Sequence, residues 1–305
     1  MTHDKTLRFY LDEDLKTSAE KGAHNFIGKV AGVAQAAGFD VEYHTNSLAS
    51  RHASADLGGY AMFHMDAPTH ARALTMRRAY YYPFWQIETS AKRWDWRVAK
   101  TPFEVGDVDR DVADRFFKFW RKRLFANKAD RPTHDGYVYV PLQGRLTEHR
   151  SFQTCSPIKM IEHTLAQDTF RKVVATLHPN EAYSKDELET LETLAKQHTR
   201  LTVRTGGMEE LLAGCDYVVT QNSSAGFTGF LFQKPCITFA KIDFHHMTAH
   251  VPDIGIEHAF GEITEMQPDY AGYVWWFLQK MSINAGRPEA EDDIRAALIR
   301  SGWPM

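Results

Sequence analysis

The clearest hydrophobic pattern in the chain lies between residues 172 and 239. Three short apolar runs rich in β-branched residues, at 172–177, 201–205 and 216–221, alternate there with polar, helix-like segments. This alternation predicts strand–helix–strand units and therefore a parallel sheet. Ligands of open parallel sheets bind beyond the carboxyl ends of the strands. We therefore expect the residues that follow these runs to share one edge of the sheet.

Two of the runs are followed by residues that suit a phosphate. His178-Pro179 ends the first run, and Asn222-Ser223-Ser224 follows the third. Ser223 or Ser224 is expected to cap a helix over AGFTGFLFQ, whose N-terminal amides and positive dipole end attract anions. A capped helix in a Rossmann-like core, with His178 holding a turn, would produce the same pattern without a ligand.

Small and polar residues near the same strand ends extend this candidate site. Gly226 and Gly229 are expected to leave room for a bulky ligand at the first turn of the helix. Further residues follow predicted strands and are candidates for donor contacts: Gln143, Asp243 and His246. Gly144 would let a ligand come close.

The first part of the chain repeats the pattern. Apolar runs at 7–11, 40–44 and 60–65, with a helical pattern between 22 and 38, predict a second Rossmann-like unit. The sequence GxGxxG is absent, so a dinucleotide fingerprint is not supported.

An amphipathic helical pattern over 109–125 precedes the polar segment 126–136, which is typical of a linker. We therefore expect a first domain at 1–130 and a second at 131–268, with helices at 269–305. A chain of 305 residues has room for two domains of ordinary size.

Composition narrows the class of protein. A net charge of −3 gives no basic footprint for nucleic acid. Three cysteines without CxxC spacing favour a reducing compartment. The chain shows neither a signal-peptide apolar region nor an apolar run of membrane-spanning length. These features predict a cytoplasmic protein, and they leave open a peripheral association with the inner face of a membrane.

The motifs resemble those of bacterial GT-B glycosyltransferases that use CMP-sugars, namely sialyltransferases and capsule Kdo transferases with HP and SS motifs. The segments VPLQGR (140–145), LHPNE (177–181) and SSAGFTGFLFQKPCITF (223–239) resemble the capsule polysaccharide biosynthesis family, over roughly residues 137–245. This resemblance implies an α/β GT-B fold, in which two Rossmann-like domains face across a cleft and C-terminal helices cross back onto the first.

The same resemblance implies the chemistry. His178, Ser223 and Ser224 would hold the phosphate of a CMP-activated acidic sugar such as Kdo, with Pro179 and Asn222 beside them. The acceptor would be a saccharide or glycolipid of a polysaccharide assembly complex. Neither a cofactor nor a metal is expected, because the two histidine groupings lack a stereotyped ligand spacing. Those groupings are His64, Asp66 and His70, and His245, His246 and His250.

An inverting transferase also needs a base for the acceptor hydroxyl. Asp66, after the third run of the first domain, is the leading candidate, followed by His64, because an imidazole titrates near neutral pH, and then Glu88. The stretch 69–100 is rich in arginine and aromatic residues, which suits a saccharide groove as well as a packed hairpin. It is expected to begin with a helix, and it contains the candidate acceptor contacts Arg72, Arg77 and Trp85.

Two alternatives remain at this point. One is a UDP-sugar transferase or UDP-sugar 2-epimerase, whose second domain carries a comparable Ser/Gly-rich helix start. The other is a non-catalytic saccharide-binding subunit with the same fold. It is suggested by residues 175–177, which stand where capsule family members often carry a lysine, and by the missing acidic triplet of the sialyltransferases.

Overall fold

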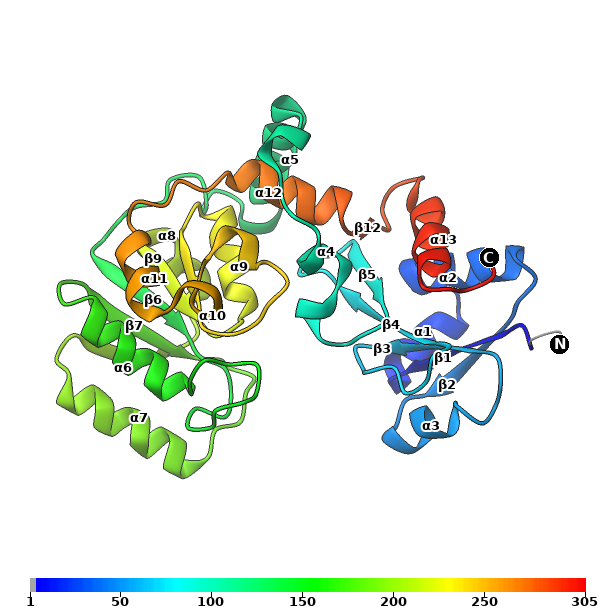
Figure 1. Ribbon diagram of the computed structural model, residues 1–305, viewed down its shortest axis with the longest axis horizontal. Coiled ribbons are helices and arrows are strands. Elements are labelled where there is room, and N and C mark those ends of the chain that lie inside the picture. Colours follow the sequence, from blue (N-terminus) through cyan, green and yellow to red (C-terminus); the bar gives the residue numbers. More distant parts are fainter. Residues whose placement is uncertain (1–3) are drawn as a thin grey trace. The chain divides into compact units, whose positions relative to one another are not determined.

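The computed structural model describes residues 4–305, apart from the side chain of Asp107, and divides into two compact units. Unit 1 consists of the residues up to Thr101 together with Phe277–Met305, and unit 2 consists of Pro102–Trp276. Each unit contains a six-stranded sheet flanked by helices (Figure 1). The expected α/β class, with two parallel-rich sheets, is confirmed.

The sheet of unit 1 has the strand order β12-β5-β4-β3-β1-β2, in which β1 to β4 are parallel, β5 is antiparallel to β4, and β12 is antiparallel to β5. The chain passes from β1 to β2 on one side and returns to β3 on the other, so the strand order reverses between β1 and β3. The strands are β1 Thr6–Leu11, β2 Asp40–Thr45, β3 Tyr60–His64, β4 Ala73–Arg78, β5 Phe84–Glu88 and β12 Ile283–Asn284.

Helices α2 and α13 bury one apolar side of this sheet, and they lie side by side although they are far apart in sequence (Figure 1). In α2 the small residues and the buried Phe26, Ile27 and Val30 face the core. The helices are α1 Glu13–Glu20, α2 Asn25–Ala36, α3 Leu48–Ala53, α4 Arg97–Lys100 and α13 Ala290–Arg300, with a 3₁₀ turn η1 at Arg93–Asp95. The C-terminal segment from Phe277 therefore returns to unit 1, as the GT-B resemblance implied, but the expected start at residue 269 is too early, because the helix Tyr270–Trp275 belongs to unit 2.

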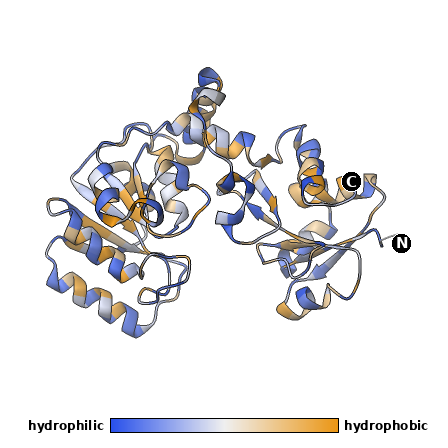
Figure 2. Cartoon of the chain, in the orientation of Figure 1, coloured by the Kyte–Doolittle hydropathy of each residue, from blue (hydrophilic) through white to orange (hydrophobic). Residues whose placement is uncertain are grey.

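The sheet of unit 2 has the order β11-β10-β9-β6-β7-β8, and every pair in it is parallel. Its strands are predominantly hydrophobic (orange in Figure 2), as expected for strands covered on both faces. Its order reverses between β6 and β9. The strands are β6 Tyr137–Pro141, β7 Lys172–Leu177, β8 Leu201–Thr205, β9 Tyr217–Thr220, β10 Cys236–Thr238 and β11 Ala249–His250.

Helix α9 (Ser224–Leu231) is apolar on all sides because protein surrounds it. A Cβ atom on Gly226 would lie 3.1 Å from Sγ of Cys236 and 3.2 Å from the ring of Phe244, and one on Gly229 would lie 3.4 Å from Val218. These glycines let the helix approach the sheet. The expectation that they make room for a ligand was wrong.

The other helices of unit 2 pack against its strands or against one another. They are α5 Arg110–Phe125, α6 Pro157–Gln167, α7 Lys185–Gln197, α8 Met208–Gly214, α10 Val251–Ile254, α11 Ile256–Glu262 and α12 Tyr270–Trp275. Short 3₁₀ turns η2 and η3 span Val105–Asp107 and His245–Met247, and a π-helical turn, η4, spans Trp276–Lys280.

Two segments differ from the sequence-based expectation. The expected helix around Arg72–Arg78 is strand β4, because its backbone pairs with β3 on one side and β5 on the other. The units also divide at Thr101 rather than at residue 130, because α5 packs on α12 and Arg110 pairs with Asp269 at the start of α12.

Candidate functional site

Polar side chains gather at the carboxyl ends of the strands of unit 2. Gln143 and Gly144 follow β6, and Asn222 and Ser223 follow β9, which are the two strands at which the order reverses. His178 follows the neighbouring strand β7. The structure thus brings these predicted donor residues to one edge of one sheet, at the position where ligands of open α/β sheets bind.

The turn after β7 holds His178 in an exposed position with a defined tautomer. The backbone N–H of Asn180 donates to Nδ1 of His178 at 3.2 Å, and the backbone N–H of His178 donates to the hydroxyl of Tyr183 at 2.8 Å. Because Nδ1 acts as an acceptor, the neutral imidazole carries its proton on Nε2. His178 therefore offers one hydrogen-bond donor from an exposed ring.

The start of α9 assigns different roles to the two serines. Ser223 is the N-cap, and its buried hydroxyl accepts from the backbone N–H of Ala225 at 3.2 Å. Ser224 is exposed in the first turn. A helix N-terminus carries partial positive charge. The Ser224 hydroxyl and the N-terminal amides of α9 are therefore the groups suited to an anion.

The loop between β6 and α6 contributes residues that the sequence reading missed. Gln153 forms a β-bridge with Ala240, and the N–H of Lys241 donates to the carbonyl of Phe152 at 3.0 Å. These contacts fasten the loop to the segment after β10 and bring Arg150 and Gln153 to the carboxyl edge. The sequence signal was weak: a polar stretch beginning directly after a strand.

Gly144, in the same loop, is less open than expected. A Cβ atom on Gly144 would lie 2.8 Å from Oε2 of Glu181, the residue that follows the His178 turn by three positions. The absent side chain at 144 thus leaves space for a protein carboxylate.

Asp243 and His246 lie deeper than the sequence suggested. Asp243 is completely buried, and Nδ1 of the half-buried His246 lies 3.1 Å from the hydroxyl of Tyr273. Burial first, and then the carboxylate of Asp243, raises the pKa of that phenol. His250 is also buried, and burial lowers its pKa to about 4. These residues form a polar core behind β10 and β11.

Unit 1 has a second polar edge where its strand order reverses. Asp12 follows β1 and His64 ends β3, and Oδ2 of Asp12 lies 4.0 Å from Nδ1 of His64. Burial lowers the pKa of His64, and the carboxylate of Asp12 opposes that shift. The imidazole is therefore neutral at pH 7 and able to accept a proton.

Asp66, the leading base candidate, is engaged with its neighbours. Its Oδ2 accepts from Nδ2 of Asn46 at 2.7 Å and from Nη1 of Arg51 at 2.8 Å. Between Asp66 and His64, Met65 has a φ of 66°, a strained value for a residue with a Cβ atom. Strain of this kind clusters at functional sites. The carboxylate of Asp66 is thus engaged by Asn46 and Arg51 beside this strained residue.

The candidate acceptor contacts Arg72, Arg77 and Trp85 lie in different parts of unit 1. Arg77 lies near the carboxyl end of β4, and its charge contributes to the lowered pKa of His64. Trp85 is only 5% exposed and stacks on Phe26 with ring centroids 4.6 Å apart, so it is chiefly a core residue. Arg72 precedes β4, and its Nε donates to the carbonyl of Gly59 at 2.7 Å, away from the carboxyl edge.

Glu88 also lies away from that edge, because β5 runs antiparallel to β4 and Glu88 pairs with Thr75. Its carboxylate accepts from the backbone N–H of Arg97 at 3.0 Å. Burial raises the pKa of Glu88 to about 7. The pKa of Glu88 would suit a base, but Glu88 does not lie at the carboxyl edge where Asp12 and His64 meet.

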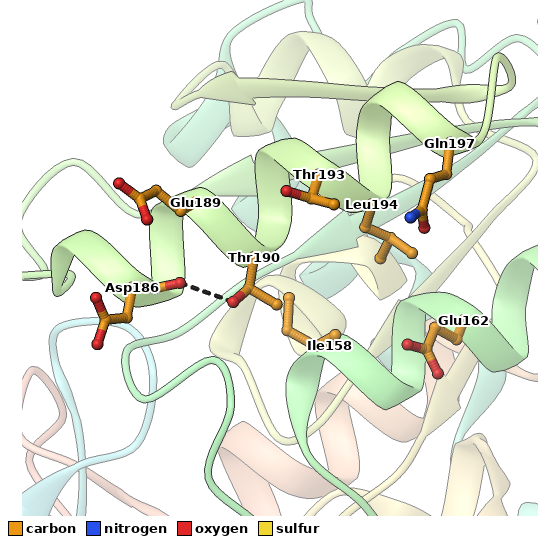
Figure 3. A pocket seen from close by; sticks show the side chains of 8 residues that line it. All are labelled: Ile158, Glu162, Asp186, Glu189, Thr190, Thr193, Leu194 and Gln197. Carbon is orange, nitrogen blue, oxygen red and sulfur yellow. Dashed lines mark hydrogen bonds between the residues drawn. The ribbon is translucent and has the colours of Figure 1, made fainter.

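The hollows on the surface of unit 2 lie elsewhere. One of about 400 Å³ lies between α6 and α7 (Figure 3). Its described lining includes the carboxylates of Glu162, Asp186 and Glu189 and no cationic residue, which disfavours phosphate. Another, of about 660 Å³, lies at the amino end of β9, beside the ion pair of Arg171 and Asp216.

Two structural features are absent from residues 4–305. No group of three or more His, Cys, Asp or Glu side chains is placed to hold a metal ion. Within the same residues, no helix has both the length and the apolar character needed to cross a bilayer.

No protein-family model and no curated protein matches the sequence. Among solved structures, the chain is similar to the β-Kdo 2,7 transferase of Thermosulfurimonas dismutans KpsC, with a TM-score of 0.53, 12% identity and coverage of 97% of this chain and 99% of that one. That likeness establishes a GT-B-like fold over the whole chain.

Two more distant structures also align. The β-Kdo 2,4 transferase of the same KpsC has a TM-score of 0.43 at 13% identity and covers 79% of this chain and 81% of its own. The UDP-GlcNAc 2-epimerase of Methanocaldococcus jannaschii has a TM-score of 0.39 at 10% identity and covers 97% and 99%.

Proposed function

We propose that the protein is a glycosyltransferase of capsule or surface polysaccharide assembly, which transfers an acidic sugar such as Kdo from a CMP-activated donor to a saccharide acceptor. The observation that carries the proposal is the edge of unit 2, where exposed His178 and the N-terminus of α9 follow strands at or beside the reversal of strand order. The GT-B-like fold, shared with the β-Kdo 2,7 transferase of KpsC, supports the same class.

The donor phosphate is the group that this edge suits. Glycosyl transfer leaves negative charge on the departing nucleotide, and fixed donors aimed at that charge lower the barrier. The Nε2–H of His178, the Ser224 hydroxyl and the first amides of α9 supply such donors without a metal. A CMP-sugar has a single phosphate, which matches one imidazole and one helix N-terminus.

The base comes from unit 1. His64 is neutral at pH 7 because burial lowers its pKa, and it accepts the proton of the acceptor hydroxyl. The carboxylate of Asp12, 4.0 Å away, stabilises the imidazolium that forms. In this assignment Asp66 holds the loop through Asn46 and Arg51.

The test is a thermal-shift and calorimetric titration of the whole protein with CMP, UDP, GDP and ADP. A ligand that binds only the folded state raises the melting temperature by mass action. We expect CMP to bind best and His178→Ala and Ser224→Ala each to weaken it by roughly tenfold, the loss of one charge-assisted hydrogen bond. Ser184→Ala, which removes the N-cap of α7 in the same unit, is the matched control and leaves CMP affinity unchanged.

Other outcomes overturn parts of the proposal. Preference for UDP overturns the donor assignment and favours a UDP-sugar transferase, or an epimerase if the UDP-sugar is converted without an acceptor. If no nucleotide binds and a saccharide does, the protein is a non-catalytic saccharide-binding subunit.

A further inference from the structure

Three polar atoms at the carboxyl edge of unit 2 are buried without hydrogen-bond partners. Within residues 4–305, none is found for Nε2 of Gln153, Oε1 of Gln221 or Nε of Arg150. Gln153 is 7% exposed and Gln221 is 3% exposed. A buried polar atom left unpaired costs about 1–3 kcal/mol. Three such atoms at one edge therefore indicate a ligand that supplies the missing partners.

The existing hydrogen bonds fix what each side chain offers. Nε2 of Gln221 donates to the carbonyl of Cys155 at 3.0 Å, so this amide presents its oxygen as an acceptor. Oε1 of Gln153 accepts from the backbone N–H of Arg150 at 2.8 Å, so that amide presents its NH₂ as a donor. The set contains two donors, one of them charged, and one acceptor.

Backbone contacts bring the two glutamines to the same short segment. Gln221 follows β9, and its carbonyl accepts from the N–H of Ala240 at 3.1 Å. Gln153 forms its β-bridge with the same Ala240. Arg150 belongs to the turn that Gln153 closes, since the N–H of Gln153 donates to the carbonyl of Arg150 at 2.9 Å. Ser223, the cap of α9, lies two residues beyond Gln221.

The charge of Arg150 needs a counter-ion. Its half-buried guanidinium lies 4.9 Å from the ring centroid of Phe152 and forms no ion pair within the described part of the chain. Arg145, in the same loop, is exposed and already pairs with Glu148 at 3.2 Å. Burial first, and then the charge of Arg145, lowers the pKa of Arg150, while the carboxylates of Glu148 and Glu181 oppose that shift without forming an ion pair with it. The guanidinium of Arg150 and the amide NH₂ of Gln153 belong to the same turn and both donate hydrogen bonds, which suits a carboxylate.

We propose that Arg150 and Gln153 bind the carboxylate of the donor's acidic sugar, and that Gln221 accepts a hydrogen bond from one of its hydroxyls. This inference rests on the proposed function, in which His178 and α9 hold the phosphate. The subsite is what distinguishes an acidic sugar from a neutral one, because a neutral sugar leaves the Arg150 charge unpaired.

The experiment compares CMP, CMP-Kdo and UDP-glucose by calorimetry on the full-length protein. Gln153→Glu keeps an oxygen for the Arg150 N–H and replaces the donor NH₂ by a second acceptor, so it repels a carboxylate. We expect it to weaken CMP-Kdo by tenfold or more and to leave CMP unchanged. Arg150→Gln is the second variant, with the same expected pattern. Arg145→Gln, which removes an equal charge from the same loop, leaves both affinities within twofold.

Unchanged CMP binding shows that each variant is folded. Equal CMP-Kdo affinity for wild type, Gln153→Glu and Arg150→Gln overturns the subsite while the proposed function stands. An equal loss for UDP-glucose shows that the residues read hydroxyls, which overturns the carboxylate assignment. If wild type does not bind CMP at all, the proposed function fails, and this donor subsite fails with it.

Discussion

The carboxylate of Asp12 lies 4.0 Å from Nδ1 of His64, where the strand order of unit 1 reverses. His64 ends β3, and Asp12 directly follows the neighbouring strand β1, so the pairing of these two strands helps to set their spacing. Burial favours the neutral imidazole, and the carboxylate favours its protonated form. This opposition suits a group that must accept a proton during a reaction and then release it.

The base assignment predicts different effects for two neighbouring substitutions. His64→Gln should lower kcat by about 10²–10⁴-fold, the usual contribution of general base catalysis, without changing CMP affinity. Asp66→Asn should lower stability, because it weakens the bonds to Asn46 and Arg51, and should change kcat little. Steady-state kinetics with matched calorimetry measures both. If the Asp66→Asn protein is folded but has lost its activity, then Asp66 rather than His64 is the base.

The Asp12–His64 pair also predicts a shift in the pH profile. Asp12 raises the pKa of His64, so Asp12→Asn should lower that pKa further. The base is active when unprotonated, so the acid limb of kcat/KM should move to lower pH. Asp14→Asn, in the first turn of α1, is the control and should leave the limb in place. An unmoved limb in Asp12→Asn would mean that His64 is not the titrating base.

The strands of unit 2 and their end residues could be predicted because the signals are local. Runs of β-branched residues end at His178-Pro179 and before Ser223, and the end of each strand can be recognised from the few residues around it. Strand β4 could not be predicted, because its conformation depends on pairing with β3 and β5.

The missed site residues depend on contacts between distant parts of the chain. Gln153 reaches the edge only because the loop that carries it pairs with Ala240. The unit boundary depends on Arg110 and Asp269, which are 159 residues apart. Sequence alone also does not show that Asn46 and Arg51 hydrogen-bond to the carboxylate of Asp66.

The packing of α9 predicts a stability effect at Gly226. Gly226→Ala places a Cβ atom 3.1 Å from Sγ of Cys236 and 3.2 Å from Phe244, so it should destabilise the protein by about 1–3 kcal/mol through overpacking. Gly261→Ala is the matched control: it is helical too, and its Cβ would meet no atom within 4 Å. That variant should be neutral or more stable, by up to about 1 kcal/mol. Urea denaturation distinguishes the two, and equal stability would contradict the packing account.

Glu88 predicts a pH dependence of stability. Its pKa is about 7 in the folded protein against an ordinary 4.5, because of burial. Between these values the folded state retains a proton that the unfolded state has lost, so stability falls as pH rises through this window and levels off above about pH 7.

Glu88→Gln should remove that fall while keeping an acceptor for the Arg97 N–H. At pH 8 the variant should be more stable than wild type by up to about 3 kcal/mol, measured by urea denaturation between pH 5 and 8. Glu20→Gln, at an exposed position of α1, should retain the wild-type slope. If the free energy of unfolding of Glu88→Gln depends on pH as it does in wild type, then a group other than Glu88 causes that dependence.

The division of the chain has a consequence for its synthesis on the ribosome. Unit 2 is complete once Trp276 has emerged, whereas unit 1 still lacks β12 and α13. Until then β5 has an unpaired edge and the apolar side of α2 is uncovered, a state prone to association with other chains. We therefore expect unit 2 to reach its native state first. The sheet of unit 1, although most of it is synthesised earlier, is the part of the nascent chain that we expect to need chaperone protection.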